Sequence, residues 1–155
     1  MIATDYFKGI AAGLLAMIAP SALMLVRSAT HRLPQLDFIE MLSTLAGMPD
    51  NAAAGWTMAV LAGSVVLGTL FAWLEPRIPG DSHTRRGILF SVGTWLAIMV
   101  FLMPNLDAGL FGLRLSLLLP IGTFVLHVVY GAALGWVYGM LDPTGTPELP
   151  HRSRL

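Results

Sequence analysis

Four stretches of the 155-residue chain contain no Asp, Glu, Lys or Arg, and this feature constrains the fold more than any other. With 18, 24, 20 and 27 residues, they are Gly9–Val26, Asn51–Leu74, Gly87–Leu106 and Leu115–Leu141. A helix needs roughly 20 residues to cross a hydrocarbon core about 30 Å thick. Only helices or closed barrels satisfy every backbone group in lipid, and the alternation typical of strands is absent. We therefore expect four transmembrane helices.

The expected architecture is an all-α membrane protein with one integral membrane domain, residues 1–155. We predict spans at about residues 8–27, 53–74, 87–105 and 115–140, a short interfacial helix at about 37–47, and a flexible tail at 143–155. The first apolar stretch is longer than the roughly 7 to 15 residues of a signal-peptide core. We therefore interpret it as a span rather than a signal peptide.

Composition excludes several classes of function. Charged residues make up 12% of the chain, about half the roughly 25% of an ordinary soluble domain. Nine Lys and Arg balance nine Asp and Glu, so no basic surplus is available to bind nucleic acid. Cysteine is absent, which excludes disulfides, thiolate metal sites and cysteine nucleophiles.

Aromatic and basic residues predict how the spans are placed. Trp56 and Trp73 are 17 residues apart in the sequence, or about 26 Å along a helix, and therefore bracket one hydrocarbon core. We expect Tyr6, Trp73, Trp136 and Tyr138 at one membrane interface, and Trp95 between helices.

The basic residues predict the orientation, because they stay preferentially on the cytoplasmic side. The side that holds both termini has six, and they are Lys8, Arg77, Arg85, Arg86, Arg152 and Arg154. The other side has three, and they are Arg27, Arg32 and Arg114. We therefore predict that both termini are cytoplasmic. On that side we expect Arg77, Arg85 and Arg86 to meet anionic lipid headgroups.

Three landmarks recur in the same order in the two halves of the chain. The matched segments are Lys8-Gly9-Ile10 with Arg86-Gly87-Ile88, Leu33-Pro34-Gln35-Leu36-Asp37 with Met103-Pro104-Asn105-Leu106-Asp107, and Gly68, Trp73 and Glu75-Pro76 with Gly131, Trp136 and Asp142-Pro143. We interpret them as two tandem helical hairpins, which would be parallel repeats about an axis along the membrane normal. Chance similarity between apolar segments is the alternative.

The loop between spans 1 and 2 contains the predicted interfacial helix. Asp37 followed by Glu40 resembles a capping box, and Gly47 with Pro49 forms a stop signal. The apolar positions between them fall mainly on one face. Whether this helix lies on lipid, covers the mouth of the bundle or serves only as a spacer stays open.

The last span contains a small-residue stripe with a four-residue spacing, namely Thr123, His127, Gly131, Gly135 and Gly139. The second span has a similar stripe, namely Ser64, Gly68 and Ala72. Small residues let helix backbones approach closely in lipid. We predict that Gly131, Gly135, Gly139, Ser64, Gly68 and Ala72 are helix-packing residues and that the two stripes meet near the centre of the bundle.

His127 is the main candidate functional residue, because an ionisable side chain deep in a span is costly to bury in lipid. Thr123 and Ser64 are further polar candidates within the spans. The structural interpretation is a neutral imidazole that donates to a carbonyl or to Ser64 across the helix interface. A proton-relay or substrate site is the functional interpretation. Ligation of a cofactor is a third, but haem ligation by two histidines needs a second buried one, and we expect His31, His83 and His151 in loops or the tail.

Enzyme motifs are absent: the chain has no His-Glu-x-x-His, no Gly-x-Ser-x-Gly and no phosphate-binding glycine loop. Polar residues on the far side could gather around a metal, and these are His31, Asp37, Glu40, Asp50 and Asp107. Scattered loop carboxylates are usually solvated, so we expect no catalytic, metal or cofactor site.

Several segments carry a resemblance to a known family. They are Met103-Pro104, Gly109-Leu110-Phe111-Gly112, Leu126-His127, Tyr130-Gly131 and Gly135-Trp136-Val137-Tyr138-Gly139. In these the chain resembles, nearly end to end, a family of small bacterial four-span inner-membrane proteins of unknown function. The resemblance implies a bacterial inner membrane and no particular activity.

The sequence favours a non-enzymatic membrane protein, a structural or accessory subunit that packs through its glycine stripes in a homo-oligomer or with other membrane subunits. The expected partners are membrane lipid, other subunits or a second copy, and no nucleic acid. The alternative is a small transporter or channel with a polar site around His127. Small multidrug transporters are a four-span comparison, but they carry a glutamate in the first span, and this chain has none there.

Overall fold

The structure is a computed structural model that describes residues 2–23 and 38–142; residues 1, 24–37 and 143–155 lie outside it. Four helices in the described ranges are long and apolar enough to cross a membrane, at Asp5–Leu23, Ala52–Arg77, His83–Asn105 and Leu119–Leu141. These same ranges contain no strand. The expected all-helical, four-span fold is thus confirmed, while the predicted tail and the end of predicted span 1 lie outside the described residues.

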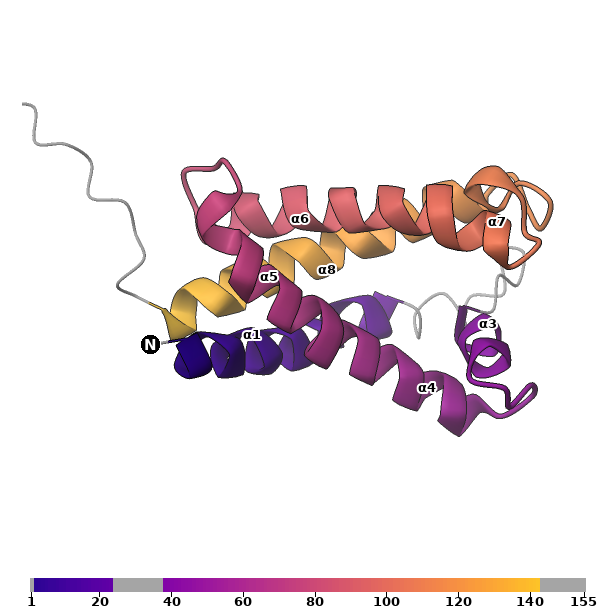
Figure 1. Cartoon of the computed structure of the whole chain (residues 1–155), viewed down its shortest axis with the longest axis horizontal. Helices are drawn as coiled ribbons and strands as arrows, with labels where there is room; N and C mark the ends of the chain where they lie inside the picture. Colours follow the sequence, from indigo (N-terminus) through magenta and orange to yellow (C-terminus); the bar gives the residue numbers. More distant parts are fainter. Residues whose placement is uncertain (1, 24–37, 143–155) are drawn as a thin grey trace, which may run out of the picture.

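The helices run lengthwise beside one another (Figure 1). Helix α1 is Ile2–Ala16, with further helical turns at residues 18–23. The second span joins α4 (Ala52–Leu61), η1 (Ala62–Leu67) and α5 (Gly68–Leu74), and is followed by η2 (Glu75–Arg77). The third joins α6 (His83–Ala97), η3 (Ile98–Leu102) and α7 (Met103–Asn105), and the fourth is α8 (Leu119–Leu141). Both η1 and η3 are π-helical, a feature that no sequence pattern predicted.

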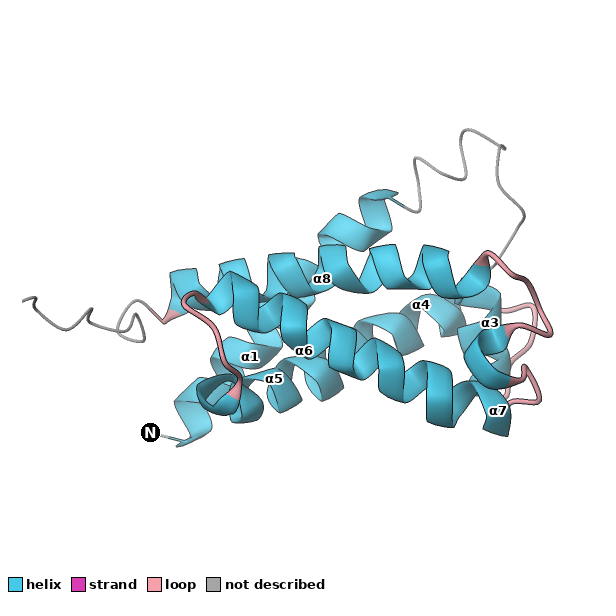
Figure 2. Cartoon of the chain, turned by 90° about the horizontal axis from the view of Figure 1, so that it is seen from above, coloured by secondary structure: helices cyan, strands magenta, loops and turns pink. Residues whose placement is uncertain are grey.

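Two ends of the bundle differ. At one end α1 begins, α5 passes into η2, α6 begins and α8 ends, and we call this the charged end (Figure 1). At the other end lie the short helices α3 (Phe38–Leu45) and α7, with loops beside them, and we call this the loop end (Figure 2).

Three helices begin away from the predicted span starts, and the first is α1, which begins at Ile2 rather than near residue 8. Helix α6 begins at His83 rather than near residue 87, because the Ser82 side chain caps it by accepting from the Arg85 amide. Helix α8 begins at Leu119 rather than near residue 115. The connection before it contains the short 3-10 turn η4 (Leu110–Gly112). It also contains positive-φ residues that a regular α-helix does not accommodate, namely Asp107, Gly109, Phe111 and Gly112.

The two helix pairs α1–α5 and α6–α8 each pack through glycines. A side chain on Gly9 would collide with the carbonyl oxygen of Gly68, and one on Gly87 with that of Gly131. Close backbone contact of this kind substitutes for the hydrophobic force that is absent between helices in lipid.

Aromatic rings join the two pairs in the part of the bundle nearer the charged end. Phe71 of α5 lies 5.3 Å, between ring centroids, from both Phe90 of α6 and Tyr138 of α8. Tyr130 of α8 donates its hydroxyl to the carbonyl of Gly63 in η1. Tyr138, which was expected at the membrane interface, is buried in this cluster close to the charged end, and its level in the membrane stays a prediction.

Helix α3 packs on α4, where Gly55 leaves room for the backbone of Ile39. Its Leu42 and Ser43 are buried, and Met41 packs against a cluster at the loop end that includes Met99 and Met103. These contacts favour a cover over the loop end, among the three roles left open by the sequence.

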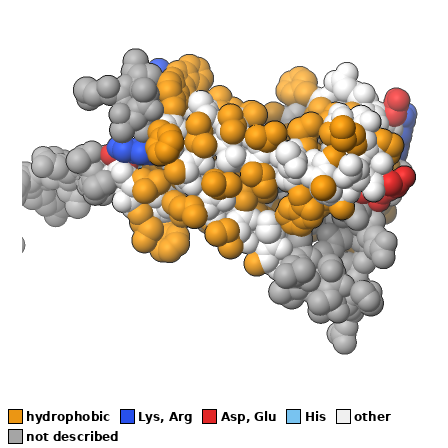
Figure 3. Space-filling model, turned by 90° about the horizontal axis from the view of Figure 1, so that it is seen from below, with side chains coloured by type: hydrophobic (Ala, Val, Ile, Leu, Met, Phe, Trp, Pro, Cys, Tyr) orange, Lys and Arg blue, Asp and Glu red, His pale blue; other side chains and the backbone are white. Residues whose placement is uncertain are grey.

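The outside of the bundle is apolar between its two ends. Figure 3 shows hydrophobic side chains along the middle of one face and charged side chains only towards its ends. Large apolar side chains point outward from all four spans, among them Phe7, Ile18, Val66, Phe101 and Ile121. This is the surface that a bilayer requires of a membrane protein.

Candidate functional site

The two small-residue stripes do not meet each other, contrary to our expectation. Added side chains on Gly13 or Gly9 of α1 would contact Ser64 or Gly68 and Ala72, so this stripe faces α1. The glycines of α8 face α6, since Gly131 lies against Gly87 and Ser91, and Gly135 and Gly139 lie against His83. The i, i+4 spacing identified which residues share a face, but not which helix that face meets.

The three predicted polar candidates do not form a common site. Ser64 donates to the carbonyl of Val60 over 2.5 Å. Thr123 donates to the carbonyl of Leu119 and accepts from the indole of Trp95, over 2.7 and 3.1 Å. Trp95 therefore lies between helices, as its position in the third span indicated.

His127 is half-buried in α8, where its Nδ1 lies 2.8 Å from the carbonyl oxygen of Thr123 in the same helix. A neutral imidazole donates this bond. We expected a bond across the helix interface, to a carbonyl or to Ser64, but the observed bond stays within α8.

The most concentrated polar group lies instead at the charged end, around His83. We expected this histidine in a loop, but it is the first residue of α6 and only 8% exposed. Its Nδ1 lies 2.8 Å from Oε1 of Glu75, which is also buried. The same Oε1 accepts from the guanidinium of Arg86 over 2.7 Å.

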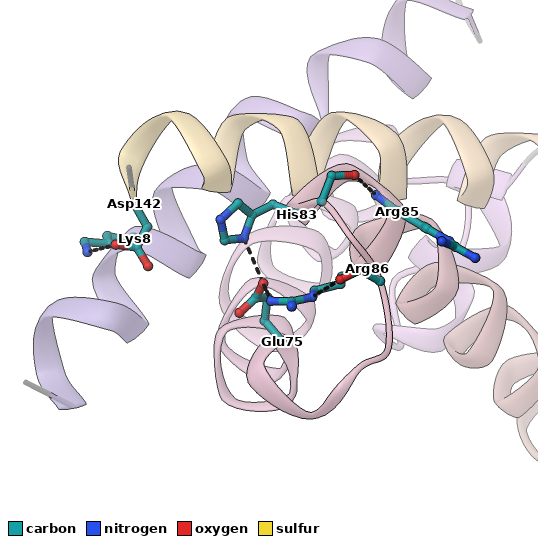
Figure 4. A network of polar contacts seen from close by, with 8 residues as sticks. Lys8, Glu75, His83, Arg85, Arg86 and Asp142 are labelled. Atoms are coloured by element: carbon teal, nitrogen blue, oxygen red, sulfur yellow. Dashed lines mark hydrogen bonds and ion pairs between the residues drawn. The ribbon is translucent and has the colours of Figure 1, made fainter. Parts of the chain in front are cut away.

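A second ion pair lies beside this triad. Lys8 of α1 donates to Asp142, the residue after α8, over 3.1 Å, and lies 3.7 Å from Asp5. Figure 4 shows the imidazole of His83 between the Lys8–Asp142 pair and the Glu75 carboxylate. We call Lys8, Asp142, Glu75, His83 and Arg86 the terminal cluster.

The His83 ring is tightly enclosed. It lies against Gly139, where an added Cβ would be only 3.0 Å from its Cδ2, and its centroid is 5.9 Å from that of Tyr138. Its Nε2 is buried and has no hydrogen-bond partner among the residues that the structure describes. A donor bond from Nδ1 to a carboxylate fixes the tautomer and leaves Nε2 as a basic lone pair, the arrangement of a proton acceptor or metal ligand.

A comparison with known protein families finds a match over almost the whole sequence. Residues 3–148 match DUF6789, a family of unknown function. The chain belongs to this family. No curated protein and no solved structure matches it. Membership confirms the resemblance to four-span proteins of unknown function, while the bacterial origin and the inner membrane stay predictions.

Metal ligands do not converge in this DUF6789 protein as far as it is described: residues 2–23 and 38–142 contain no group of three His, Asp or Glu that could hold an ion. Of the far-side candidates, Glu40 and Asp50 line a shallow groove with Ser43, and Asp107 lies in the loop before η4. His31 and Asp37 lie outside the described residues.

One local signal in the DUF6789 chain could have revealed the buried histidine. Ser82 lies three residues before Arg85 and directly before a long helical pattern, so it is a helix cap. This moves His83 into the first turn of α6. Nothing in the sequence places the carboxylate of Glu75 beside it, because that contact depends on the turn at residues 78–82.

Proposed function

We propose that this protein is a non-enzymatic structural or accessory subunit of a bacterial inner-membrane complex or homo-oligomer, with both termini cytoplasmic. The observation that carries this proposal is the use of polar groups inside the spans. Ser64, Thr123 and His127 each donate to a carbonyl of their own helix. A transport pathway instead needs polar groups that converge on a solute, so this arrangement favours a packing role over transport around His127.

The subunit contact must use the outer surface rather than the glycine stripes, because the stripes are occupied inside the chain. Phe101 is 70% exposed near the loop end, and Trp136 is 59% exposed near the charged end. Aromatic side chains of this size supply contact area to lipid or to another membrane helix.

Cross-linking in native membranes tests the proposal, and the absence of cysteine allows single-cysteine variants without a background. Cysteine at Phe101 or Trp136 should cross-link to a second subunit or a second copy, whereas cysteine at the fully buried Leu134 should not. A chain that purifies alone, forms no cross-link and moves solute in liposomes would contradict the proposal and favour the transporter.

His127→Asn adds a second criterion. Asn keeps a hydrogen-bond donor but cannot take up a proton near neutral pH. Complex assembly and complex activity should therefore both survive, when measured on the same samples. Loss of activity with intact assembly would indicate a proton role for His127.

Anionic lipid is the second partner we propose, at Arg77. Among the cations described at the charged end, Lys8, Arg85 and Arg86 each pair with a carboxylate. The guanidinium of Arg77 instead bonds the carbonyl of Trp73 over 2.6 Å and lies 5.0 Å from the centroid of its indole. An unpaired cation beside an exposed interfacial tryptophan suits a lipid phosphate.

Native mass spectrometry checks the lipid proposal. Arg77→Gln should retain less anionic lipid than the unmodified chain in mixed vesicle extracts. Arg85→Gln is the matched control and should change little, because Arg85 is paired with Asp81 over 2.8 Å. Equal losses in the two variants would argue against a particular site at Arg77.

A further inference from the structure

The buried imidazole of His83 has one satisfied nitrogen and one unsatisfied nitrogen. Nδ1 pairs with Glu75 over 2.8 Å, and Nε2 has no partner although the side chain is about nine-tenths buried. A buried polar atom without a partner costs about 1 to 3 kcal/mol, and more when the group is charged. The packing is therefore suited to one protonation state of this ring and poorly suited to the other.

The state that fits is the neutral imidazole. Its Nδ1–H donates to the Glu75 carboxylate, and Nε2 then has only a lone pair unmet. In the imidazolium, Nε2 carries an N–H and shares the positive charge, so the same enclosed position holds an unpaired charged donor. Protonation of Nε2 therefore favours conformations of the charged end in which water can reach this nitrogen.

Charged side chains gather at this end of the bundle. The Glu75 carboxylate lies 2.8 Å from Nδ1 of the ring, and Asp142 and Asp5 lie 3.1 and 3.7 Å from Nζ of Lys8. Two cations face them, Lys8 from α1 and Arg86 from α6. Among the described residues of this cluster, three carboxylates thus face two cations, and an imidazolium would add a third positive charge. Arg85 and Asp81 neutralise each other at the exposed rim of α6.

We propose that His83 is a proton-binding site and that proton binding opens the charged end to water. Glu75 retains the imidazolium, while the proton on Nε2 requires an acceptor that the closed packing lacks. Water can enter past the Lys8–Asp142 pair, whose side chains are 25% and 20% exposed and which lies beside the ring (Figure 4). The ligand is thus a proton, and the response is a separation of the first turns of α6 from Gly139 of α8.

This proposal goes beyond the subunit role and does not depend on which partner the protein has. It is tested on the full-length chain in lipid nanodiscs, by hydrogen exchange corrected for the intrinsic effect of pH. Between pH 7.5 and 5.5, a range that brackets the ordinary titration of histidine near 6.5, protection of the amides of residues 86–91 should fall on the order of tenfold. Residues 124–130 of α8, away from the charged end, should not change.

Two sets of variants assign the response to one ring. His83→Gln should remove the difference between the two pH values, because its amide does not titrate. A chain in which His31, His127 and His151 are all replaced by Gln should keep the difference. A response that survives His83→Gln, or that disappears in the triple variant, would contradict the proposal.

Proton occupancy is measured directly on the unmodified chain, so the test does not depend on how well His83→Gln folds. In ¹⁵N-histidine spectra, the Nε2 signal of His83 should change from the unprotonated to the protonated position over the same range. A His83 that stays neutral down to pH 5.5 would overturn the binding site. Protonation with unchanged amide protection would overturn the opening.

Discussion

The helix pairs α1–α5 and α6–α8 are joined by the same device but differ in the polar atoms they bury. Gly9 meets Gly68 in the first pair, and Gly87 meets Gly131 in the second, at positions that correspond in the proposed duplication. The first pair buries Ser64, whose hydroxyl is satisfied. The second buries the unsatisfied atoms, Oγ of Ser91 and Nε2 of His83. Both pairs thus use glycines for close backbone contact, whereas only the second pair contains buried polar atoms without a hydrogen bond to a described residue.

The ion pairs extend this comparison. In the duplicated alignment Lys8 corresponds to Arg86, and Glu75 corresponds to Asp142. Lys8 pairs with Asp142, and Arg86 pairs with Glu75, so each half supplies its acid to the base of the other half. Two parallel repeats around a shared axis would give this reciprocal pattern, and the duplication stays a prediction.

Breaking the contact between α6 and α8 should have the largest effect. In Gly135→Leu the new side chain collides with the His83 carbonyl, and its Cβ would lie 2.7 Å from Cα of Thr84. We expect a loss of about 3 kcal/mol or more in the free energy of unfolding, measured by denaturant titration in mixed micelles. Gly93→Leu is the control, since Gly93 is exposed with open space around it, and an equal loss there would refute the assigned packing.

Alanine at corresponding glycines tests whether the two pairs are equivalent. Gly9→Ala and Gly87→Ala each place a methyl group against a backbone carbonyl of the facing helix. Each should lower the free energy of unfolding by about 2 kcal/mol, whereas Gly122→Ala, in open space, should be nearly neutral. If Gly9→Ala and Gly87→Ala differ greatly in their loss of stability, the two pairs are similar in sequence but not in the energy of their packing.

The link between the pairs should contribute less. Tyr130→Phe removes the hydrogen bond from α8 to the Gly63 carbonyl and keeps the ring. We expect a loss of about 1 kcal/mol in the free energy of unfolding. Tyr6→Phe is the control, because Tyr6 packs against the same core and its hydroxyl makes no bond to the described residues. Equal effects of the two substitutions would mean that the bond contributes nothing.

The smallest effect, and one of opposite sign, is expected at Ser91. Its hydroxyl is fully buried against α8 without a partner, so Ser91→Ala removes an unsatisfied polar atom. The free energy of unfolding should stay equal or rise by up to about 1 kcal/mol. Ser64→Ala should instead lower it slightly, because that hydroxyl bonds Val60. A marked loss of stability in Ser91→Ala would reveal a partner for this hydroxyl.

The sequence alone determined the all-helical class, the four spans and the short helix at Phe38–Leu45. These features depend on local requirements: enough apolar residues to cross lipid, a capping signal and a stop signal. The predicted start near residue 115 missed the constraint of Pro120, which fits only the first turn of a helix and sets the start of α8 at Leu119. The π-helical turns η1 and η3 were also missed, because they have no composition of their own.

The tertiary structure alone decided which helix each glycine stripe meets and which histidine is buried. Four-residue spacing places Gly131 and Gly135 on one face of α8. The spacing does not indicate which helix packs on that face, and in the structure it is α6. His83 looked like a loop residue because its own segment is polar. It is buried by α8 and satisfied in part by Glu75, eight residues earlier, once the chain has turned back. Burial is set by what packs around a residue, and neighbours distant in sequence supply most of that packing.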